Sequence, residues 1–463
     1  MTSPHSALLG LAVEPDPHAV SQSLEEPGWL LEDRLDGIRR AADLPLETNS
    51  LWTPYVDLRL ARFGDVTPYA TSGEAAEVAT HRPRGASATI HVREDTLVER
   101  GIDPDAERAG VIVDTFANVM RRDPDLLRRL IEEGAGLPAN DRLAQLTRAW
   151  FGLGVVVYVP DGVHLEQPIA LRWSMGEPGS GCLTRTIVAL GRDAHASMLE
   201  EQDASAAPDG RQSLWTGTTE VLLGEGATLD VAAQEDFGPD TVAFVHRRAR
   251  LGTSASLRWA LATVGGRLVK HRIDNDLEGR GASVRQVEIA FGGADQLFDM
   301  SSYTRHLGED TTGDLLSKGV FKDRSRGFFK GLIEIKQHAR GTDSFLGEFG
   351  MLLSKKARSV TIPSLEIDQP DVRRAAHSSS VGPIDESQVF YLMSRGVPED
   401  VARKFVVLGF LEPVVARIPL PEAQQRLRGL LDRKWSTSAS DQAGGGHPAG
   451  RRTEPGVPAA AGA

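Results

Sequence analysis

The middle of the chain repeats a short glycine–alanine frame at a regular spacing. The sequence Leu-Gly-x-x-Ala begins at Leu190, Leu223 and Leu251, and Glu278-Gly-x-x-Ala continues the series. The offsets between successive copies are 33, 28 and 27 residues. A glycine at a fixed place permits a turn with positive φ, and a small alanine fits where coils stack closely. This period indicates that each copy is one unit of a repeating architecture.

Short strand-like segments fill the chain between and around these copies. From Val155 to about Ile367 they follow one another, each bounded by Gly, Asp or Pro, and no long helical pattern interrupts them. Strands that repeat at this period without crossover helices favour a solenoid of β-coils. A β-sandwich is the structural alternative, because its strands also come with turn signals every 8–12 residues or so.

The regions on either side of the strands have different textures. Residues 1–28 are rich in Pro, Ser, His and Glu and predict a mobile leader. Residues 29–152 form a helical region that contains a strand segment near 87–92. Residues 385–435 predict a second helical region, and 436–463 lack any apolar period and predict a disordered tail. The predicted fold class is therefore mainly β, with a right-handed parallel β-helix core over 153–384 flanked by helical N- and C-terminal regions.

The helices after residue 384 carry clear start and stop signals. Asp385 can cap the first helix through its carboxylate, and Gly396 can end it. Pro398 suits the first turn of a second helix. One face of that helix should be apolar, since it carries Val401, Ala402, Phe405, Val406 and Gly409.

Composition excludes several classes of function. The net charge of −12 argues against nucleic acid as a partner. No apolar run approaches the roughly 18 residues of a membrane span, and no basic segment precedes Leu8 as in a secretory signal. We therefore expect a cytoplasmic protein with no membrane partner. Cys182 is the only cysteine, which excludes an internal disulfide and a multi-cysteine metal site and fits a small buried side chain in a strand.

Motifs of self-contained catalysis are missing from the sequence. There is no G-x-x-x-x-G-K-[ST], no H-E-x-x-H and no G-x-S-x-G. This favours a scaffold or interaction protein and not an enzyme. The alternative function is a β-helix enzyme or binding solenoid acting on polysaccharide, which would need acidic residues grouped on one face. Asp230, Asp236 and Asp240 are the nearest such group.

The stretch 362–413 resembles the C-terminal signature of the SufB/SufD family. Its order is His-Ser-Ser-Ser-Val-Gly-x-Ile-Asp from His377, followed by Phe-Tyr-Leu-x-Ser-Arg-Gly-Val from Phe390. Members of that family are scaffolds of the SUF iron–sulfur cluster assembly machinery, with a β-helix core between helical parts. The resemblance implies a non-catalytic scaffold subunit that pairs with a SufB-like subunit and docks a SufC-like ABC-type ATPase. ATP hydrolysis would then belong to the partner.

The resemblance also implies a metal-ligating role for His377. Many family members have Lys-Cys-Ser-His-Gly-Ala-Thr-Val-Gly where this chain has Arg-Ala-Ala-His-Ser-Ser-Ser-Val-Gly, so Ala375 replaces a cysteine and points to the SufD branch. Imidazole suits iron and can replace thiolate in cluster ligation. His377 is therefore expected on a loop at the subunit interface, as a ligand of iron or of an iron–sulfur cluster that is transient and shared with the partner. Glu366 and Asp368 lie close by in sequence and are candidates for supporting it, and the alternative, which we favour, is that they are solvated loop charges.

The two helices after Asp385 resemble the ATPase-contacting region of the family. Four side chains are the candidates for partner binding there: Phe390, Tyr391, Arg395 and Lys404. Two further histidines, His306 and His338, fit exposed strand faces and receive no role.

Overall fold

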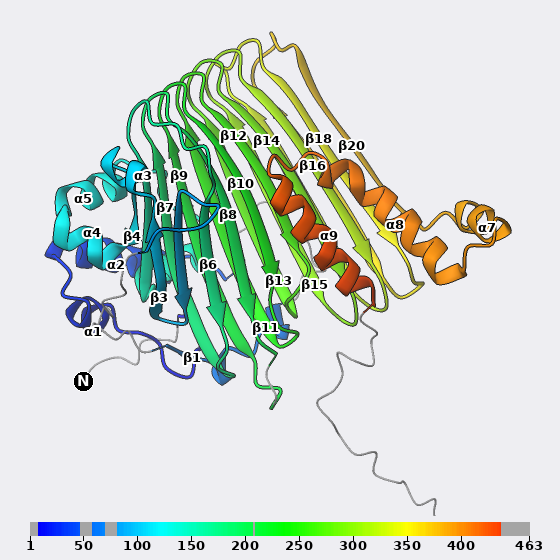
Figure 1. The fold of residues 1–463 in the computed structure, drawn as a ribbon, viewed down its shortest axis with the longest axis horizontal. Coiled ribbons are helices and arrows are strands. Elements are labelled where there is room, and N and C mark those ends of the chain that lie inside the picture. Colours follow the sequence, from blue (N-terminus) through cyan, green and yellow to red (C-terminus); the bar gives the residue numbers. More distant parts are fainter. Residues whose placement is uncertain (1–7, 47–57, 70–80, 207–208, 437–463) are drawn as a thin grey trace, which may run out of the picture.

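Two β-sheets of ten strands each form the body of the protein, and all neighbouring strands except the pairs β2–β3 and β4–β5 run parallel. The computed structural model describes residues 8–46, 58–69, 81–206 and 209–436. From β5 onward the odd-numbered strands lie in one sheet, called the odd sheet here, and the even-numbered strands in the other, the even sheet, so the chain alternates between the two (Figure 1). From β5 to β20 this gives a solenoid of about eight coils with two strands each. The predicted β-solenoid with helices at both ends is confirmed, and the β-sandwich is excluded because sequential neighbours within each sheet run parallel.

The odd sheet contains β1 (Thr67–Pro68), β4 (Ile112–Thr115), β5 (Leu153–Val159), β7 (Ser180–Leu190), β9 (Ser213–Leu223), β11 (Thr241–Leu251), β13 (Leu268–Leu277), β15 (Leu297–His306), β17 (Arg326–Ile335) and β19 (Arg358–Ile367). The even sheet contains β2 (Ala88–Arg93), β3 (Thr96–Ile102), β6 (Ile169–Met175), β8 (His195–Ala204), β10 (Thr228–Asp236), β12 (Ser256–Thr263), β14 (Ser283–Gly292), β16 (Thr312–Phe321), β18 (Asp343–Leu352) and β20 (Arg374–Pro383). The α-helices are α1 (Pro17–Ser23), α2 (Gly28–Asp43), α3 (Pro104–Arg108), α4 (Phe116–Arg122), α5 (Pro124–Glu132), α6 (Arg142–Trp150), α7 (Glu386–Ser394), α8 (Glu399–Val415) and α9 (Pro421–Ser436).

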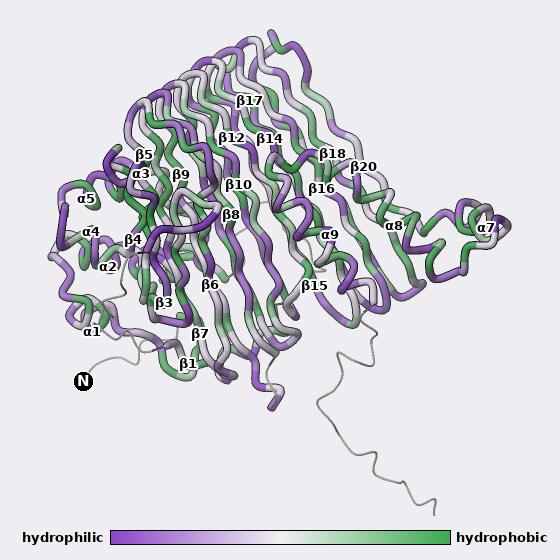
Figure 2. Tube along the Cα trace, viewed as in Figure 1, coloured by the Kyte–Doolittle hydropathy of each residue, from purple (hydrophilic) through white to green (hydrophobic). Residues whose placement is uncertain are grey.

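Side chains alternate between the interior of the solenoid and its outer faces. Apolar and polar residues accordingly alternate along many of the strands (Figure 2). The leucines of the repeated frame stack in register, since Leu190 pairs with Leu223 and Leu223 with Leu251. All three belong to the main core between the sheets. The outward-facing residues are covered by helices at both ends of the solenoid, which buries many of them as well.

The frame glycines are required by close backbone approach and not by their φ angle. A Cβ on Gly252 would lie 3.0 Å from the carbonyl oxygen of Leu223, and one on Gly279 would lie 2.0 Å from the nitrogen of Thr253. The expected positive φ occurs two residues later in each turn, at Asp193, Gly226, Ser254 and Gly281. The alanine of the frame is fully buried in every copy, as expected for closely stacked coils.

Antiparallel strands and helices cover the N-terminal end of the solenoid. Short β4 pairs with β5, and β3 pairs with β2, both antiparallel. Strand β2 coincides with the segment expected near 87–92. Residues 1–7 of the expected leader and 437–463 of the expected tail lie outside the described residues. Within the leader the structure has helix α1, which begins after Asp16, whose side chain accepts a hydrogen bond from the His18 N–H.

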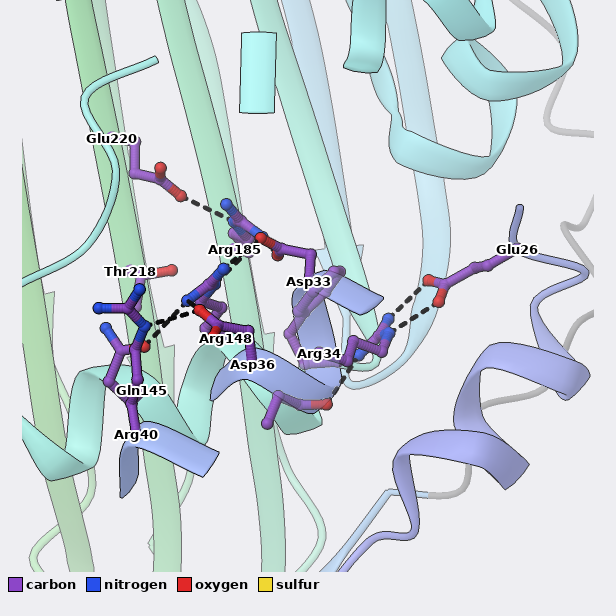
Figure 3. A network of polar contacts seen from close by, with 12 residues as sticks. Glu26, Asp33, Arg34, Asp36, Arg40, Gln145, Arg148, Arg185, Thr218 and Glu220 are labelled. Atoms are coloured by element: carbon purple, nitrogen blue, oxygen red, sulfur yellow. Dashed lines mark hydrogen bonds and ion pairs between the residues drawn. The ribbon is translucent and has the colours of Figure 1, made fainter. Parts of the chain in front are cut away.

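Buried ion pairs join the N-terminal helices to the outer face of the odd sheet (Figure 3). The guanidinium of Arg185 on β7 contacts Asp33 of α2 at 2.8 Å and Glu220 of β9 at 2.7 Å. Arg148 of α6 contacts the same Asp33 at 2.5 Å. Burial alone would disfavour the charge of Arg185, but these carboxylates outweigh it and raise its pKa.

The C-terminal helices lie on the outer face of the even sheet and extend past its last strand. Helices α8 and α9 cross β10 to β18, and α7 projects beyond β20 (Figure 1). Lys318 of β16 donates a hydrogen bond to the Phe410 carbonyl of α8 at 2.7 Å. In the part of the chain that the structure describes, no helix is long and apolar enough to cross a membrane.

Candidate functional site

The last coil of the solenoid, β19 and β20, has no further coil stacked on it. Each strand pairs on one side only, β19 with β17 and β20 with β18, and each ends its sheet. Most residues of both strands are at least partly exposed, unlike those of the preceding coils. An unpaired parallel edge presents free N–H and C=O groups to which another chain can add.

His377 lies on strand β20 and not on a loop. All ten residues of β20 pair with β18, so the Ser- and Gly-containing run is held extended by its neighbour. His377 stands over Leu346, which is buried in the interior with Ile333 of the opposite sheet. The imidazole therefore belongs to the inward-facing row of the last coil, and it is exposed because no coil covers it.

Ala375 stands two residues before His377 in the same inward-facing row. It pairs in register with Ser344 and packs against the small apolar cluster at this end of the solenoid. A cysteine at this position would therefore face the same way as the imidazole. Glu366 lies elsewhere: it pairs with Glu334 on the outer face of the odd sheet. There Glu334, and to a smaller extent Asp368 and Glu366, raise the pKa of Lys336. The structure does not bring Glu366 or Asp368 to the row of His377.

No group of three or more His, Cys, Asp or Glu side chains that could hold a metal ion occurs among the described residues. A metal bound at His377 would need further ligands from another molecule. Cys182 is buried in β7, at the other end of the solenoid, and burial raises the pKa of its thiol strongly. It supplies neither a thiolate nor a position near His377.

The acidic residues considered for polysaccharide chemistry do not form a catalytic pair. Asp230 lies on the outer face of β10 and is paired with Arg258 of β12. Asp236 ends the same strand, and Asp240 lies in the turn before β11. The structure gives this group no shared cleft with two facing carboxylates.

Exposed apolar side chains gather at the same end of the molecule. Among the described residues, six of the eight exposed large hydrophobic side chains lie on the last coil or on α7 and α8. Ile367 and Val381 belong to the inward-facing rows of β19 and β20. The other four are Phe390, Tyr391, Met393 and Phe405. Clustered exposed apolar groups of this kind mark surfaces of interaction.

Local sequence signals fix the two helices that carry these side chains. The Asp385 carboxylate accepts a hydrogen bond from the Ser387 N–H and caps α7, as predicted. Gly396 ends α7 with φ of 87°, also as predicted. Pro398 stands at the N-cap of α8, one position before its first turn.

The four candidate partner-binding residues differ in their exposure and in the contacts that they already make within the chain. Phe390 is 72% exposed and Tyr391 57% exposed, the two highest fractions among the large hydrophobic residues of these helices. The Arg395 guanidinium lies 5.4 Å from the centre of the Tyr391 ring, so both belong to one surface. Lys404 instead forms a 2.8 Å ion pair with Asp432 and joins α8 to α9.

A groove of about 820 Å³ lies between α7, α8 and the last strands of the even sheet. Its lining includes Met351, Pro383, Tyr391 and Phe405. Phe405 belongs to the predicted apolar face of α8, and it is 54% exposed at the groove. The apolar stripe of α8 is wider than the strip the sheet can cover, because Ala402, Val407 and Leu411 already fill the contact. Only the position of the sheet reveals which edge of such a stripe stays open.

These features define a β-solenoid protein whose last coil is uncovered and lies beside helices with exposed aromatic side chains. The family description "SUF system FeS cluster assembly, SufBD core domain" matches residues 173–410, and "SufBD protein N-terminal region" matches 85–171. The chain belongs to this SufBD family of iron–sulfur cluster assembly proteins.

Relatives of known assignment agree with the family. The iron–sulfur cluster assembly protein SufD of Bacillus subtilis is 26% identical over 423 residues, which cover 89% of this chain and 96% of that protein. SufB of the same organism is 24% identical over 429 residues, or 88% of this chain and 90% of that protein. A SufBD family protein of Staphylococcus epidermidis is 23% identical over 428 residues, or 88% of this chain and 90% of that protein. The chain is thus similar to both branches along most of its length.

Proposed function

We propose that this chain is the SufD-like scaffold subunit of a SUF complex, without catalytic activity of its own. It pairs through its last coil with a SufB-like subunit and docks a SufC-like ATPase on α7 and α8. The iron–sulfur cluster, or its iron, is the cargo, held transiently between the two scaffold subunits in the cytoplasm. The alanine at position 375, where many family members have cysteine, supports the SufD branch.

The observation that carries this proposal is the uncovered last coil with His377 in its inward-facing row. Two unpaired strand edges and two exposed apolar side chains, Ile367 and Val381, give a homologous solenoid end something to cover. His377 lies within that surface, where a ligand can face a partner without disturbing the core. One imidazole cannot hold a cluster alone, so the proposal requires the remaining ligands to come from the partner.

Within the chain the roles divide as follows. His377 supplies a neutral imidazole nitrogen to the metal, and Ala375 supplies no thiol. The strand pairing of β20 with β18 fixes the direction of the imidazole, which matters because metal ligation demands defined geometry. The helices beyond Asp385 keep the ATPase to the side of the last coil, away from the strand edges.

Co-expression with a SufB-like subunit and the ATPase, followed by anaerobic purification, tests the proposal. We expect one complex by size-exclusion chromatography, and a sharp loss of iron, sulfide and visible absorption in the His377→Ala complex. Complex formation itself should persist, because an exposed histidine buries little area. Ser379→Ala, on the same row of the same strand, is the matched control.

Three results would count against the proposal. A chain that elutes separately from its partner contradicts pairing. Equal cluster content in His377→Ala and wild type removes the ligand role. ATP hydrolysis by the purified chain contradicts the division of labour with the ATPase.

A further inference from the structure

Two carboxyl groups lie inside the solenoid near its open end, in one inward-facing ladder. Glu288 of β14 pairs in register with Ser317 of β16, and Ser317 with Glu348 of β18. The Ser317 hydroxyl donates a hydrogen bond to Glu288 Oε2 at 2.7 Å. Both glutamates are 2% exposed. The next position of the ladder is Ser379 of the last coil.

The basic side chains inside the solenoid form their ion pairs with other carboxylates. The Arg247 guanidinium contacts Glu200 at 2.6 Å and Glu235 at 3.4 Å, and His271 Nε2 lies 2.6 Å from Glu235. Burial disfavours the charge of Glu235, but His271 and Arg247 outweigh it and lower its pKa. Among the described residues no ion pair is formed by Glu288 or Glu348.

The surroundings of Glu348 are neutral on every side except towards Glu288. Across the interior, Gly331 of β17 leaves room for its carboxyl, since a Cβ there would lie 2.9 Å from Glu348 Oε1. The backbone N–H of Ile362 on β19 approaches the carboxyl. From β16 and β20 the paired residues are Ser317 and Ser379. The one other titratable side chain in the inward-facing row of β20 is His377, which stands over Leu346.

One oxygen of each glutamate is buried without a hydrogen bond from the described residues. Glu348 Oε2 and Glu288 Oε1 are buried and have no hydrogen-bond partner among the described residues. A carboxylate in that condition is far more costly than a neutral acid. Burial, followed by the charge of Glu288, raises the pKa of Glu348 to about 8. Burial also raises the pKa of Glu288. The hydrogen bond from Ser317 and the nearby His271 of β13 oppose this rise only in part, and the charge of Glu235 on β10 adds to it.

We propose that Glu348, with Glu288 behind it, is a proton-binding site that controls how the last coil packs on the solenoid. When the carboxyl is neutral, β19 and β20 close over it. When the proton leaves to bulk water, the carboxylate requires hydration, and the cheapest route to water is through the last coil. The last coil is paired on one side only, so it can separate without displacing another coil. Exposing Glu288 would also require the displacement of β16 and β18, which lie between β14 and β20 in the even sheet. The proposal concerns this chain alone and stands or falls independently of the function proposed above.

Hydrogen exchange of the isolated chain, followed by mass spectrometry and expressed as protection factors, tests the proposal. At pH 9, one unit above the pKa of about 8, ionised Glu348 outnumbers the neutral form about tenfold. Protection of β19 and β20 should therefore fall between about pH 6.5 and pH 9, with a midpoint near 8, while β9 to β12 stay unchanged. Glu348→Gln should keep the last coil protected throughout, because the amide carries no charge. Glu366→Gln, on the outer face of β19, should behave as wild type.

Infrared spectroscopy of the same samples gives a second measurement. Wild type at pH 6.5 should show the carbonyl band of buried protonated carboxyl groups, and raising the pH to 9 should diminish it. If Glu348→Gln does not fold, wild type alone can still support the proposal. In that case the infrared band and the protection of the last coil should both be lost over the same pH range. Unchanged protection of β19 and β20 in wild type up to pH 9 would overturn it. So would a loss of protection in Glu348→Gln that matches wild type, since Glu348 would then not be the group responsible.

Discussion

His306 is a single side chain whose burial couples the fold to pH. It lies in the interior of the solenoid, fully buried, with its ring nitrogens 2.8 Å from Thr311 Oγ1 and 3.0 Å from Ser344 Oγ. The sequence placed it on an exposed strand face, which is wrong, because the register that turns it inward depends on its neighbours in space. Burial, only partly opposed by Asp343, lowers its pKa to about 4.

We expect His306 to destabilise the protein in mild acid. The unfolded chain binds a proton to this histidine below about pH 6.5 while the folded chain does not until about pH 4, so stability falls as the pH drops through that window. The full effect is about 3 kcal/mol. His306→Asn, whose polar side chain does not titrate in this pH range, should lose this component. Urea unfolding of both proteins from pH 4 to 7 would show it, and parallel pH profiles would contradict it.

The turn of the repeated frame is the element that sets the spacing between coils. Its glycines sit where one coil touches the next, and its alanines fill the space beneath. The frame was readable from the sequence because close approach admits only small residues. The residue with positive φ was not, since Asp193, Gly226 and Ser254 share no side-chain type at that position.

Gly279→Ala should destabilise the solenoid by about 1–3 kcal/mol. The new Cβ would lie 2.0 Å from the Thr253 nitrogen, so two coils would have to move apart. Gly409→Ala on α8 is the matched control, because nothing lies within 4 Å of its Cβ position. Since alanine favours helices, that variant should gain up to about 1 kcal/mol. Thermal unfolding of both compares them, and equal melting temperatures would refute the close-contact argument.

The ion pairs under α2 are the second device at the scale of elements. Arg185 is buried between Asp33 and Glu220, so its loss would leave the buried Glu220 carboxylate without its cation, while Asp33 keeps its contact with Arg148. Arg185→Met should cost about 3–5 kcal/mol. Arg128→Met, in an exposed pair with Glu132 on α5, should cost far less, because solvent screens that pair. Denaturant unfolding measures both, and a small effect at Arg185 would mean that the helix is held by its apolar contacts.

Much of the element order was predictable, and the exceptions have a common physical cause. Helix caps at Asp385 and Gly396 depend on neighbouring residues in the chain and were correctly predicted. His377 was expected on a loop because Ser and Gly surround it, and pairing with β18 overrides that local preference. Phe405 and Glu348 owe their exposure or burial to distant strands. The register of a strand, and the face of the sheet to which each side chain points, are set by the assembled sheets. A single sequence reveals them only where a position admits few residue types, as at the frame glycines.

At the scale of the whole molecule, the two ends of the solenoid differ. The N-terminal end closes with the short antiparallel strands β3 and β4 and a layer of helices. The C-terminal end leaves two long parallel edges open and gathers six of the eight exposed large hydrophobic side chains of the described residues. Partners are therefore expected at one end only.

Phe390→Ser and Phe405→Ser should each lower recovery of the SufC-like ATPase about tenfold in a pull-down, since exposed aromatic residues commonly dominate such contacts. Val98→Ser is the matched control, an exposed apolar residue on β3 at the other end. Arg395→Glu tests the charge on the same surface. Lys404→Glu is less informative because it would also break the pair with Asp432. Unchanged recovery in both phenylalanine variants would place the ATPase elsewhere.

The difference between the two ends limits how large an assembly can grow. Parallel edges invite further strands, and a rod open at both ends would propagate into fibres. Here β4 is only four residues long and β3 is antiparallel to its neighbour, so in the part of the chain that the structure describes the N-terminal end has no long parallel edge like those of the last coil. The long parallel edges therefore lie at one end of the described chain only. Two such bodies that meet end to end would cover these edges in each other, and we expect growth to stop at the pair.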